Sequence, residues 1–292
     1  MTMPIRPWPD FTPLSLEMRD ELFPAFRELP DGVSEFSFAG LYLFRDTYRY
    51  RVASLPSGGY VVSGEKAGEP FFLLPFEVPD QAILRGLFET HAYLKNLNAR
   101  LLAAHGAAFE AAGYRVVEDR DNFDYLYART DLAELSGKQY HKKRNLVNAF
   151  VNSYSREERP LDDSNASHAL DILEAWRLAK GIDGDFDAAR DALEHRETLG
   201  LEGRVWYVEG ASAAFALGER IARGSMFAIH FEKAVDGFKG IYQYVNQAFA
   251  SALPEEIVTL NREQDLGDEG LRQAKLTYRP NGFVMKHRVY PS

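Results

Sequence analysis

The stretch Val205-Trp-Tyr-Val-Glu-Gly-Ala-Ser-Ala-Ala-Phe-Ala-Leu-Gly-Glu219 decides the fold class of this chain. Its apolar runs predict two β-strands, at residues 205–209 and 213–219. Two further strands are predicted at residues 225–232 and 240–245, and the four together make an antiparallel meander. The elements predicted around this meander are helices at 169–181, 186–199, 246–253 and 269–278, and strands at 257–261 and 283–289.

The first half of the chain has a similar order of elements. Periodic apolar residues predict helices at 16–29 and 36–50, followed by strands at 50–55, 60–63 and 71–76. Turn residues at 56–59 and 68–70 separate these strands. An Ala- and Leu-rich stretch, residues 81–112, predicts a long helix that breaks near His105 and Gly106. Strands at 114–118 and 123–128 and a basic helix at 136–154 come next.

Repetition of one order of elements predicts two homologous α/β (α+β) modules, residues 1–155 and 156–292. We interpret the charged segment 156–167 as the connection between them. The order meander, helix, strand, helix, strand is that of the GNAT fold. The expected architecture is therefore two tandem GNAT-like acyltransferase modules, each a mixed, mostly antiparallel sheet flanked by helices.

Composition excludes several classes of function. The chain of 292 residues has no Cys, which excludes disulfides, thiolate nucleophiles and thiolate metal sites. Neither a secretory signal nor an apolar run long enough for a membrane helix is found, so a cytoplasmic protein without a transmembrane segment is expected. The net charge of −9 argues against a general nucleic-acid binder, although a local basic patch can still bind phosphate.

Known catalytic motifs are largely missing from the sequence. No G-x-G-x-x-G, Walker-type or G-x-S-x-G motif is present, which argues against dinucleotide, P-loop and serine-hydrolase chemistry. The seven His residues never pair at metal-ligand spacing, so no metal site is expected.

The densest polar stretch is residues 260–280. An apolar strand runs directly into polar residues there, at the end of a strand where α/β folds tend to bind ligands. On the following helix, Leu271, Lys275 and Tyr278 are spaced to share one face, so Lys275 is expected to be partly desolvated or paired with Glu263 or Asp265. Such a lysine could neutralise an oxyanion or a phosphate. The alternative is a structural network that locks a strand to a helix, with Lys275 reaching past Tyr278 into water.

A second polar cluster is Gly137-Lys138-Gln-Tyr-His-Lys-Lys-Arg-Asn145. On a helix, one face carries Lys138, His141, Lys142 and Asn145, and another carries Tyr140, Lys143, Arg144 and Val147. We interpret it either as an anion-binding patch for phosphate or as a solvated charged face.

Other polar residues are weaker candidates for a functional site. The segment 35–46, with Tyr42 and Arg45, is expected to pack in the core more than to form a site. Glu219, Glu232 and Gln243 belong to the second meander and are candidates to face a cleft.

These residues carry a resemblance to a known family. Residues 37–48, the cluster 137–145 and the segments Asn261-Arg-Glu-Gln-Asp-Leu-Gly267 and Gly270-Leu-Arg-Gln-Ala-Lys-Leu-Thr-Tyr-Arg-Pro280 resemble a bacterial family related to the C-terminal domain of phosphatidylglycerol lysyltransferase. The resemblance covers most of the chain and implies a tandem GNAT-like fold, as in Fem-type aminoacyl transferases. Those relatives move an aminoacyl group from aminoacyl-tRNA to an amine or a lipid hydroxyl.

The resemblance also implies roles for individual residues. Lys275 and Arg272 would stabilise charge, Glu263 and Asp265 would hold the aminoacyl amine or the acceptor, and Tyr278 would donate a hydrogen bond. The basic helix would bind phosphate of the tRNA acceptor end or of another ligand. The substrate-binding residues assigned in this way are Asn261, Arg262, Gln264, Arg272, Lys138, His141, Lys142, Lys143, Arg144 and Asn145.

Two departures from the relatives bear on the substrates. The membrane-embedded part of the lysyltransferase has no counterpart in this sequence, which disfavours membrane lipid as acceptor. The Q/R-x-x-G-x-G/A pyrophosphate loop of acetyl-CoA-dependent GNAT proteins is also missing. Its expected position is residues 244–252, which contain no glycine, so acetyl-CoA is disfavoured and no cofactor is firmly implied.

Three hypotheses follow from the sequence. The leading one is an acyl or aminoacyl transferase with aminoacyl-tRNA as a candidate co-substrate and an unknown acceptor. The alternatives are an acyl-CoA-dependent N-acyltransferase and a catalytically silent ligand-binding protein.

Overall fold

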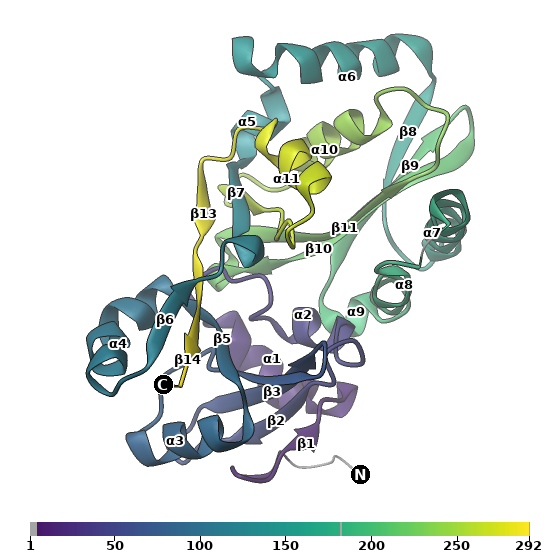
Figure 1. Cartoon of the computed structure of the whole chain (residues 1–292). Coiled ribbons are helices and arrows are strands. Elements are labelled where there is room, and N and C mark those ends of the chain that lie inside the picture. Colours follow the sequence, from purple (N-terminus) through teal and green to yellow (C-terminus); the bar gives the residue numbers. More distant parts are fainter. Residues whose placement is uncertain (1–4, 182, 292) are drawn as a thin grey trace. The chain divides into compact units, whose positions relative to one another are not determined.

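The computed structural model describes residues 5–181 and 183–291, which form two compact units (Figure 1). Unit 1 comprises Met1–Asp124, Gln264–Glu269 and Phe283–Ser292, and unit 2 comprises Tyr125–Glu263 and Gly270–Gly282. Each contains most of one seven-stranded mixed sheet with flanking helices, which confirms the predicted fold class. In the described ranges, no helix is both long and apolar enough to cross a membrane.

Unit 1 is built on a sheet with the order β1-β2-β3-β4-β5-β14-β6. All neighbouring strands pair antiparallel except β4 with β5, which pair in parallel. The strands are β1 (Thr12–Pro13), β2 (Arg51–Ser54), β3 (Tyr60–Lys66), β4 (Glu69–Leu73), β5 (Tyr93–Asn98), β6 (Arg115–Glu118) and β14 (Lys286–Tyr290). The helices are η1 (Leu16–Met18), α1 (Arg19–Arg27), α2 (Phe38–Leu43), α3 (Gln81–Thr90), α4 (Ala99–Ala111) and η2 (Arg120–Asn122).

Unit 2 contains nearly all of a sheet with the order β13-β7-β12-β11-β10-β9-β8. Strands β8 to β11 form the antiparallel meander, and β12 pairs in parallel with β11. The strands are β7 (Asp124–Ala128), β8 (Arg156–Pro160), β9 (Glu202–Val208), β10 (Ala211–Ile221), β11 (Met226–Ala234), β12 (Thr259–Asn261) and β13 (Gly282–Val284). The helices are α5 (Arg129–Glu134), η3 (Lys138–Tyr140), α6 (His141–Ser153), α7 (Ala166–Lys180), α8 (Phe186–Glu194), α9 (Arg196–Leu199), η4 (Ala222–Gly224), α10 (Ile241–Ala252) and α11 (Glu269–Leu276).

Helix α10 replaces the strand that we predicted at residues 240–245. Ile241, Val245 and Phe249 are buried at helical spacing and belong to the same apolar cluster as Trp206 and Phe227 of the sheet. Burying each large apolar side chain contributes about 1.5–3 kcal/mol, which outweighs the strand preference of the aromatic and β-branched residues. The predicted strand was wrong because the prediction rested on local propensity, whereas packing against the sheet decides the conformation of these residues.

The predicted helix at residues 81–112 is interrupted by strand β5, so the predicted break near Gly106 was wrong. All six residues of β5 are buried, and a strand buried on both faces shows no alternation of apolar and polar residues. Asp80 and Asn98 cap the two separate helices: their side chains accept hydrogen bonds from the backbone N–H of Ile83 and Leu101.

The units divide the chain differently from the modules predicted at residues 1–155 and 156–292. The first change of unit falls after Asp124, and the C-terminal strand β14 returns to unit 1, where it lies between β5 and β6. Residues 156–160 form β8, which pairs with β9, and are therefore not the connection that we expected. All residues of β8 are exposed, so the charged edge strand gave no apolar pattern.

Candidate functional site

Two parallel strands of unit 2 separate shortly after they begin to pair. Pairing of β11 with β12 joins Met226, Phe227 and Ala228 to Thr259, Leu260 and Asn261. No further β11–β12 pairs occur in the described ranges, although β11 continues to Ala234. Polar side chains gather here: His230 and Glu232 from β11, Glu219 from β10, and Arg262 and Glu263 from the segment after β12.

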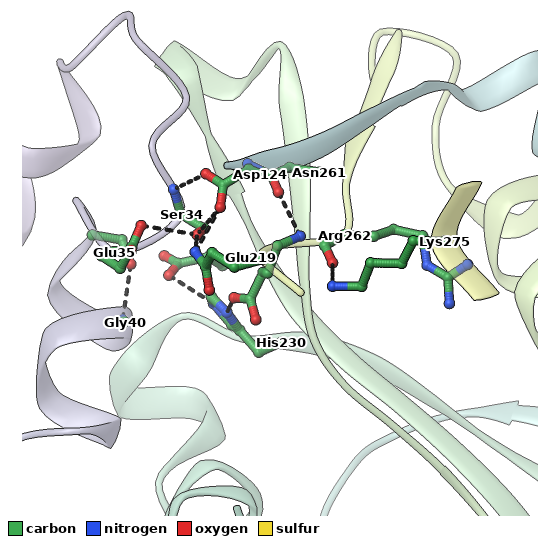
Figure 2. A network of polar contacts seen from close by, with 12 residues as sticks. Ser34, Glu35, Gly40, Asp124, Glu219, His230, Asn261, Arg262 and Lys275 are labelled. Atoms are coloured by element: carbon green, nitrogen blue, oxygen red, sulfur yellow. Dashed lines mark hydrogen bonds and ion pairs between the residues drawn. The ribbon is translucent and has the colours of Figure 1, made fainter. Parts of the chain in front are cut away.

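His230 lies between two carboxylates, and we call Glu219, His230 and Glu263 the carboxylate–histidine trio. Its Nδ1 is 2.7 Å from Oε1 of Glu263, and its Nε2 is 3.0 Å from Oε1 of Glu219. Figure 2 shows the contact between Glu219 and His230. Burial alone would lower the pKa of His230, but the hydrogen bonds to Glu219 and Glu263 raise it to about 10. The imidazole is therefore a cation at neutral pH.

A β-bulge places His230 in this position. Leu217 pairs with Phe231 and the next residue, Gly218, pairs with Ile229, so His230 is the extra residue of β11. The close approach requires glycine, because a Cβ atom at Gly218 would lie 1.9 Å from the carbonyl oxygen of Ala228. Gly218 and the extra residue of β11 thus allow His230 to reach Glu219 and Glu263.

The turn that carries Glu263 is held by Asn261. Asn261 is fully buried, and its Oδ1 accepts a hydrogen bond of 2.8 Å from the backbone N–H of Glu263. Glu263 has a φ of 56°, which is an uncommon conformation for a residue other than glycine. Asn261, predicted to bind substrate directly, therefore supports the backbone of the next acidic residue.

Arg262, Glu232 and Tyr278 form a second group beside the trio. A terminal nitrogen of Arg262 lies 3.4 Å from Oε2 of Glu232, and its guanidinium is 5.2 Å from the Tyr278 ring centroid. Burial raises the pKa of Tyr278 to about 12, so its hydroxyl stays protonated at neutral pH and can donate a hydrogen bond.

Lys143 connects the basic helix to this group. Its Nζ lies 4.0 Å from the Tyr278 ring centroid, and burial, together with the nearby Arg262, lowers its pKa. Two motifs that are far apart in the sequence therefore come together in unit 2. The two predicted faces of the helix are confirmed: Lys138, His141, Lys142 and Asn145 are exposed, while Tyr140 and Val147 are buried.

Arg144 has a local structural contact in place of an open phosphate-binding position. Its Nη1 donates to the carbonyl oxygens of Leu135 and Gly137, which closes the turn before α6. Leu135 has a φ of 50° and ends α5 in the left-handed conformation. The guanidinium thus stabilises a strained turn.

Lys275 is partly buried, as expected, although α11 has no fully buried residue. Leu271 is 42% exposed, and Tyr278 follows the end of the helix. Nζ of Lys275 donates to the carbonyl oxygen of Arg262 at 2.8 Å, a contact visible in Figure 2, and lies 5.5 Å from the Tyr125 ring centroid. Leu276 at the end of the helix packs against the apolar cluster of unit 2, and Tyr278 belongs to that cluster. Arg272, on the same helix, is half-exposed.

Two residues of the polar stretch belong to unit 1. Gln264 donates from Nε2 to Oγ of Ser34 at 2.7 Å and to Oδ1 of Asp124 at 2.6 Å. Asp265 is fully buried, accepts from the backbone N–H of Gly267 and pairs with Arg120 at 3.3 Å. These contacts fix a turn within unit 1, whereas Glu263 lies in the trio of unit 2.

A second buried set of charges lies in unit 1. Lys286 pairs with Glu35 and, at 2.7 Å, with Asp124, and Nζ of Lys95 lies 3.7 Å from Glu35. Burial would raise the pKa of Glu35, but Lys286 and Lys95 lower it to about 2. Burial lowers the pKa of Lys95 to about 8. The unit 1 network consists of Ser34, Glu35, Lys95, Asp124, Gln264 and Lys286.

The segment 35–46 packs in the core as expected. All residues of α2 are buried, and the Arg45 guanidinium lies 3.9 Å from the Tyr42 ring centroid. Sequence reasoning missed the part that Glu35 has in the unit 1 network.

The expected position of a phosphate-binding loop was wrong. Residues 244–252 lie within α10, and the loop that follows β11 is residues 235–240. That loop contains Gly237 and Gly240, with φ of 102° and 90°, but it does not match Q/R-x-x-G-x-G/A. A Cβ atom at Gly240 would lie 2.4 Å from the carbonyl oxygen of Leu146, so this glycine permits close packing against α6.

His230 is the functional candidate that the sequence reasoning missed. A lone His in an apolar strand gave no motif, and only its alternation with Glu232 was a usable signal. Across the described residues, no group of three His, Asp or Glu side chains is arranged to hold a metal ion.

Comparison with known proteins adds a family and a fold. Residues 26–290 match the family described as "Phosphatidylglycerol lysyltransferase, C-terminal". A crystal structure of a conserved protein of unknown function from Bacteroides thetaiotaomicron is 31% identical, with a TM-score of 0.85 over 97% of this chain and 99% of that one. The structure of L-PGS from Bacillus licheniformis is 16% identical, with a TM-score of 0.61 over 99% of this chain and 94% of that one. The latter likeness shows the shared fold alone.

A curated relative is an uncharacterized protein of Mycoplasmoides gallisepticum. It is 23% identical over 179 residues, which are 57% of this chain and 55% of the relative. The chain therefore spans about half the length of that relative.

Proposed function

Because this chain belongs to the phosphatidylglycerol lysyltransferase C-terminal family, within the GNAT-like aminoacyl and acyl transferase superfamily, we propose that it transfers an aminoacyl group from aminoacyl-tRNA to an amine or hydroxyl acceptor. The site for this reaction is the polar group at the separation of β11 and β12 in unit 2.

One observation supports the proposal most strongly: the site contains both carboxylates and cationic side chains. Glu263 and Glu232 supply negative charge, and Arg262 and Lys143 supply positive charge next to Tyr278. An aminoacyl ester carries an ammonium group beside its carbonyl and phosphates a few bonds away. A site with both signs of charge fits that donor, whereas an acyl-CoA has no ammonium group for the carboxylates to bind.

The chemistry requires one bond to form and one to break. The acceptor nitrogen or oxygen attacks the ester carbonyl carbon, and the bond between that carbon and the ribose oxygen of tRNA breaks. The proton of the acceptor passes to the ribose oxygen, which leaves as a hydroxyl group. Tyr278 is the donor for the oxyanion, and Arg262 and Lys143, which lie against its ring, provide positive charge beside it. Lys275 and Arg272 are the further cations for which the family resemblance implies this role.

Label transfer from charged tRNA tests the proposal. The protein is incubated with bacterial tRNA charged with ¹⁴C-labelled amino acids, and with phosphatidylglycerol vesicles or soluble amines as acceptors. We expect label to move to one acceptor class, and Glu263→Gln to reduce kcat/KM about 10- to 100-fold through loss of one charge-assisted hydrogen bond to the ammonium group. Glu202→Gln, a change in an exposed ion pair with Arg220, is the matched control and should leave the rate unchanged.

Two results would overturn the proposed donor. Transfer from acetyl-CoA or a longer acyl-CoA, with none from charged tRNA, would make the protein an acyl-CoA-dependent N-acyltransferase. Binding of charged tRNA with no turnover on any acceptor would make it a silent ligand-binding protein.

A further inference from the structure

The carboxylate–histidine trio of unit 2 has a fixed pattern of hydrogen-bond donors. An ionised carboxylate only accepts hydrogen bonds, and both ring nitrogens of His230 face carboxylate oxygens, at 2.7 and 3.0 Å. Both nitrogens therefore donate, and the ring is an imidazolium. The trio holds two negative charges and one positive charge, so it has a net charge of −1.

The three side chains of the trio differ in how much of their surface is exposed to solvent. The His230 side chain is 1% exposed, that of Glu219 5% and that of Glu263 22%. Glu263 is thus the member of the trio most exposed to solvent. Its Oε1 accepts from His230, and within the described part of the chain no hydrogen bond occupies its Oε2.

The backbone of Glu263 is fixed as firmly as its side chain. Tyr125 donates its N–H to the carbonyl oxygen of Glu263 at 3.1 Å and accepts from the N–H of Arg262 at 2.9 Å. Asn261 holds the N–H of Glu263. The carboxylate is thus immobilised from both ends before any ligand arrives, which lowers the entropic cost of binding.

We propose that Glu219 and His230 are positioning residues that present Oε2 of Glu263 to the ammonium group of the substrate. This inference rests on the proposed aminoacyl transfer and assigns Glu263 to the amine in place of the acceptor. A carboxylate that already accepts from an imidazolium is a poor proton acceptor, so it stays ionised and its second oxygen can accept a charge-assisted hydrogen bond from an ammonium group. Arg262 beside it contacts Glu232, at 3.4 Å from a terminal nitrogen to Oε2.

Discrimination between donors tests this role. Wild-type protein is given aminoacyl-tRNA and the same tRNA with the α-amino group acetylated, which removes the ammonium charge. We expect kcat/KM to favour the free amine about 10- to 100-fold, the range for one charge-assisted hydrogen bond. In His230→Gln and Glu219→Gln, we expect this preference to fall below about 3-fold, mainly through a higher KM for the free-amine donor.

A matched histidine outside the trio serves as control. His168 in the same unit makes one side-chain hydrogen bond, at 2.8 Å from Nδ1 to the hydroxyl of Tyr207. His168→Gln should keep the full preference for the free amine. A merely structural role of His230 would lower activity on both donors equally and leave the ratio unchanged, which would overturn the proposal.

Two further measurements separate failure of this inference from failure of the proposed function. If no donor is turned over, binding of a nonhydrolysable aminoacyl-adenosine amide is compared with binding of its N-acetylated form. Preference for the free amine, lost in His230→Gln, supports the inference, and equal binding overturns it. If His230→Gln does not fold, Glu219→Gln and the ¹⁵N chemical shifts of wild-type His230 decide: protonation of both ring nitrogens at pH 7 is expected, and a neutral tautomer contradicts it.

Discussion

The unit 1 network and the carboxylate–histidine trio of unit 2 both consist largely of buried charged side chains, but they are suited to different roles. In unit 1, Lys286 and Asp124 are fully buried, and two lysines balance two carboxylates. In the trio of unit 2, one imidazolium faces two carboxylates, and the more exposed carboxylate, Glu263, is 22% exposed, close to the 19% of Glu35 in unit 1. The two sets therefore differ in their partners more than in their exposure: both oxygens of Glu35 contact lysines, whereas Oε2 of Glu263 accepts no hydrogen bond within the described residues. A carboxylate with both oxygens paired stabilises a fold, whereas one with an unoccupied oxygen is suited to bind a ligand.

The largest effect is expected from breaking the unit 1 network. Lys286→Met removes the cation shared by Glu35 and Asp124 and leaves buried carboxylates without their main partner. We expect the free energy of unfolding to fall by about 3–5 kcal/mol, measured by urea denaturation. A loss below about 1 kcal/mol would mean that water or rearrangement replaces the ion pairs, and the contrast between the units would disappear.

Removal of the Tyr278 hydroxyl should lower kcat of the transfer reaction and leave the free energy of unfolding nearly unchanged. Tyr278→Phe keeps the buried ring under Arg262 and Lys143 but loses the hydrogen bond to the developing oxyanion. We expect kcat to fall about 100-fold, as for other oxyanion donors, with the free energy of unfolding changed by less than about 1 kcal/mol. An unchanged kcat in the label-transfer assay would remove Tyr278 from the site.

The trio should make stability depend on pH through His230. The pKa of His230 is raised to about 10 in the folded protein, from about 6.5 in the unfolded chain. Its stabilising contribution is therefore fully present below about pH 6.5 and is lost as pH rises through about 10.

The difference in unfolding free energy between wild type and His230→Gln isolates this contribution. It should be about 1.5–3 kcal/mol at pH 6 and should shrink between about pH 6.5 and 10, because other titrating groups are common to both proteins. A constant difference over this range would contradict the charged state of His230.

The smallest effect is expected on the exposed face of the basic helix. Lys142→Gln should reduce the slope of log K against log salt for tRNA binding by about 1 and leave kcat unchanged. Lys180→Gln, at an exposed position on α7, is the control and should leave the slope unchanged. Equal effects of the two changes would show that tRNA binding depends only on the total charge of the protein and not on the basic helix.

Much of the fold was predictable because its signals are local. The meander from β9 to β11 is a series of apolar strands, and the basic helix has one exposed and one buried face. Strand β5 and helix α10 were missed because tertiary burial, and not local preference, decides their conformation. The return of β14 to unit 1 depends on pairing with β5 over a long sequence separation, which no local pattern reports.

The site was predictable in part and for a similar reason. The polar stretch 260–280 drew attention to Glu263, Arg262 and Tyr278, but the sequence gives no sign that Gln264 and Asp265 make their contacts in a different unit. His230 was missed because its position depends on a bulge opposite Gly218, and a one-residue shift of register changes the face of every later side chain.

Hydrogen–deuterium exchange with an aminoacyl-adenosine amide tests most directly whether unit 2 holds the aminoacyl donor. We expect the ligand to slow exchange at Met226–Ala234 and at the segment containing Arg262 and Glu263, with no change at Tyr93–Asn98 of unit 1. The protection should be lost in Glu263→Gln and retained in Glu202→Gln. Protection confined to unit 1, or unchanged in Glu263→Gln, would contradict the account.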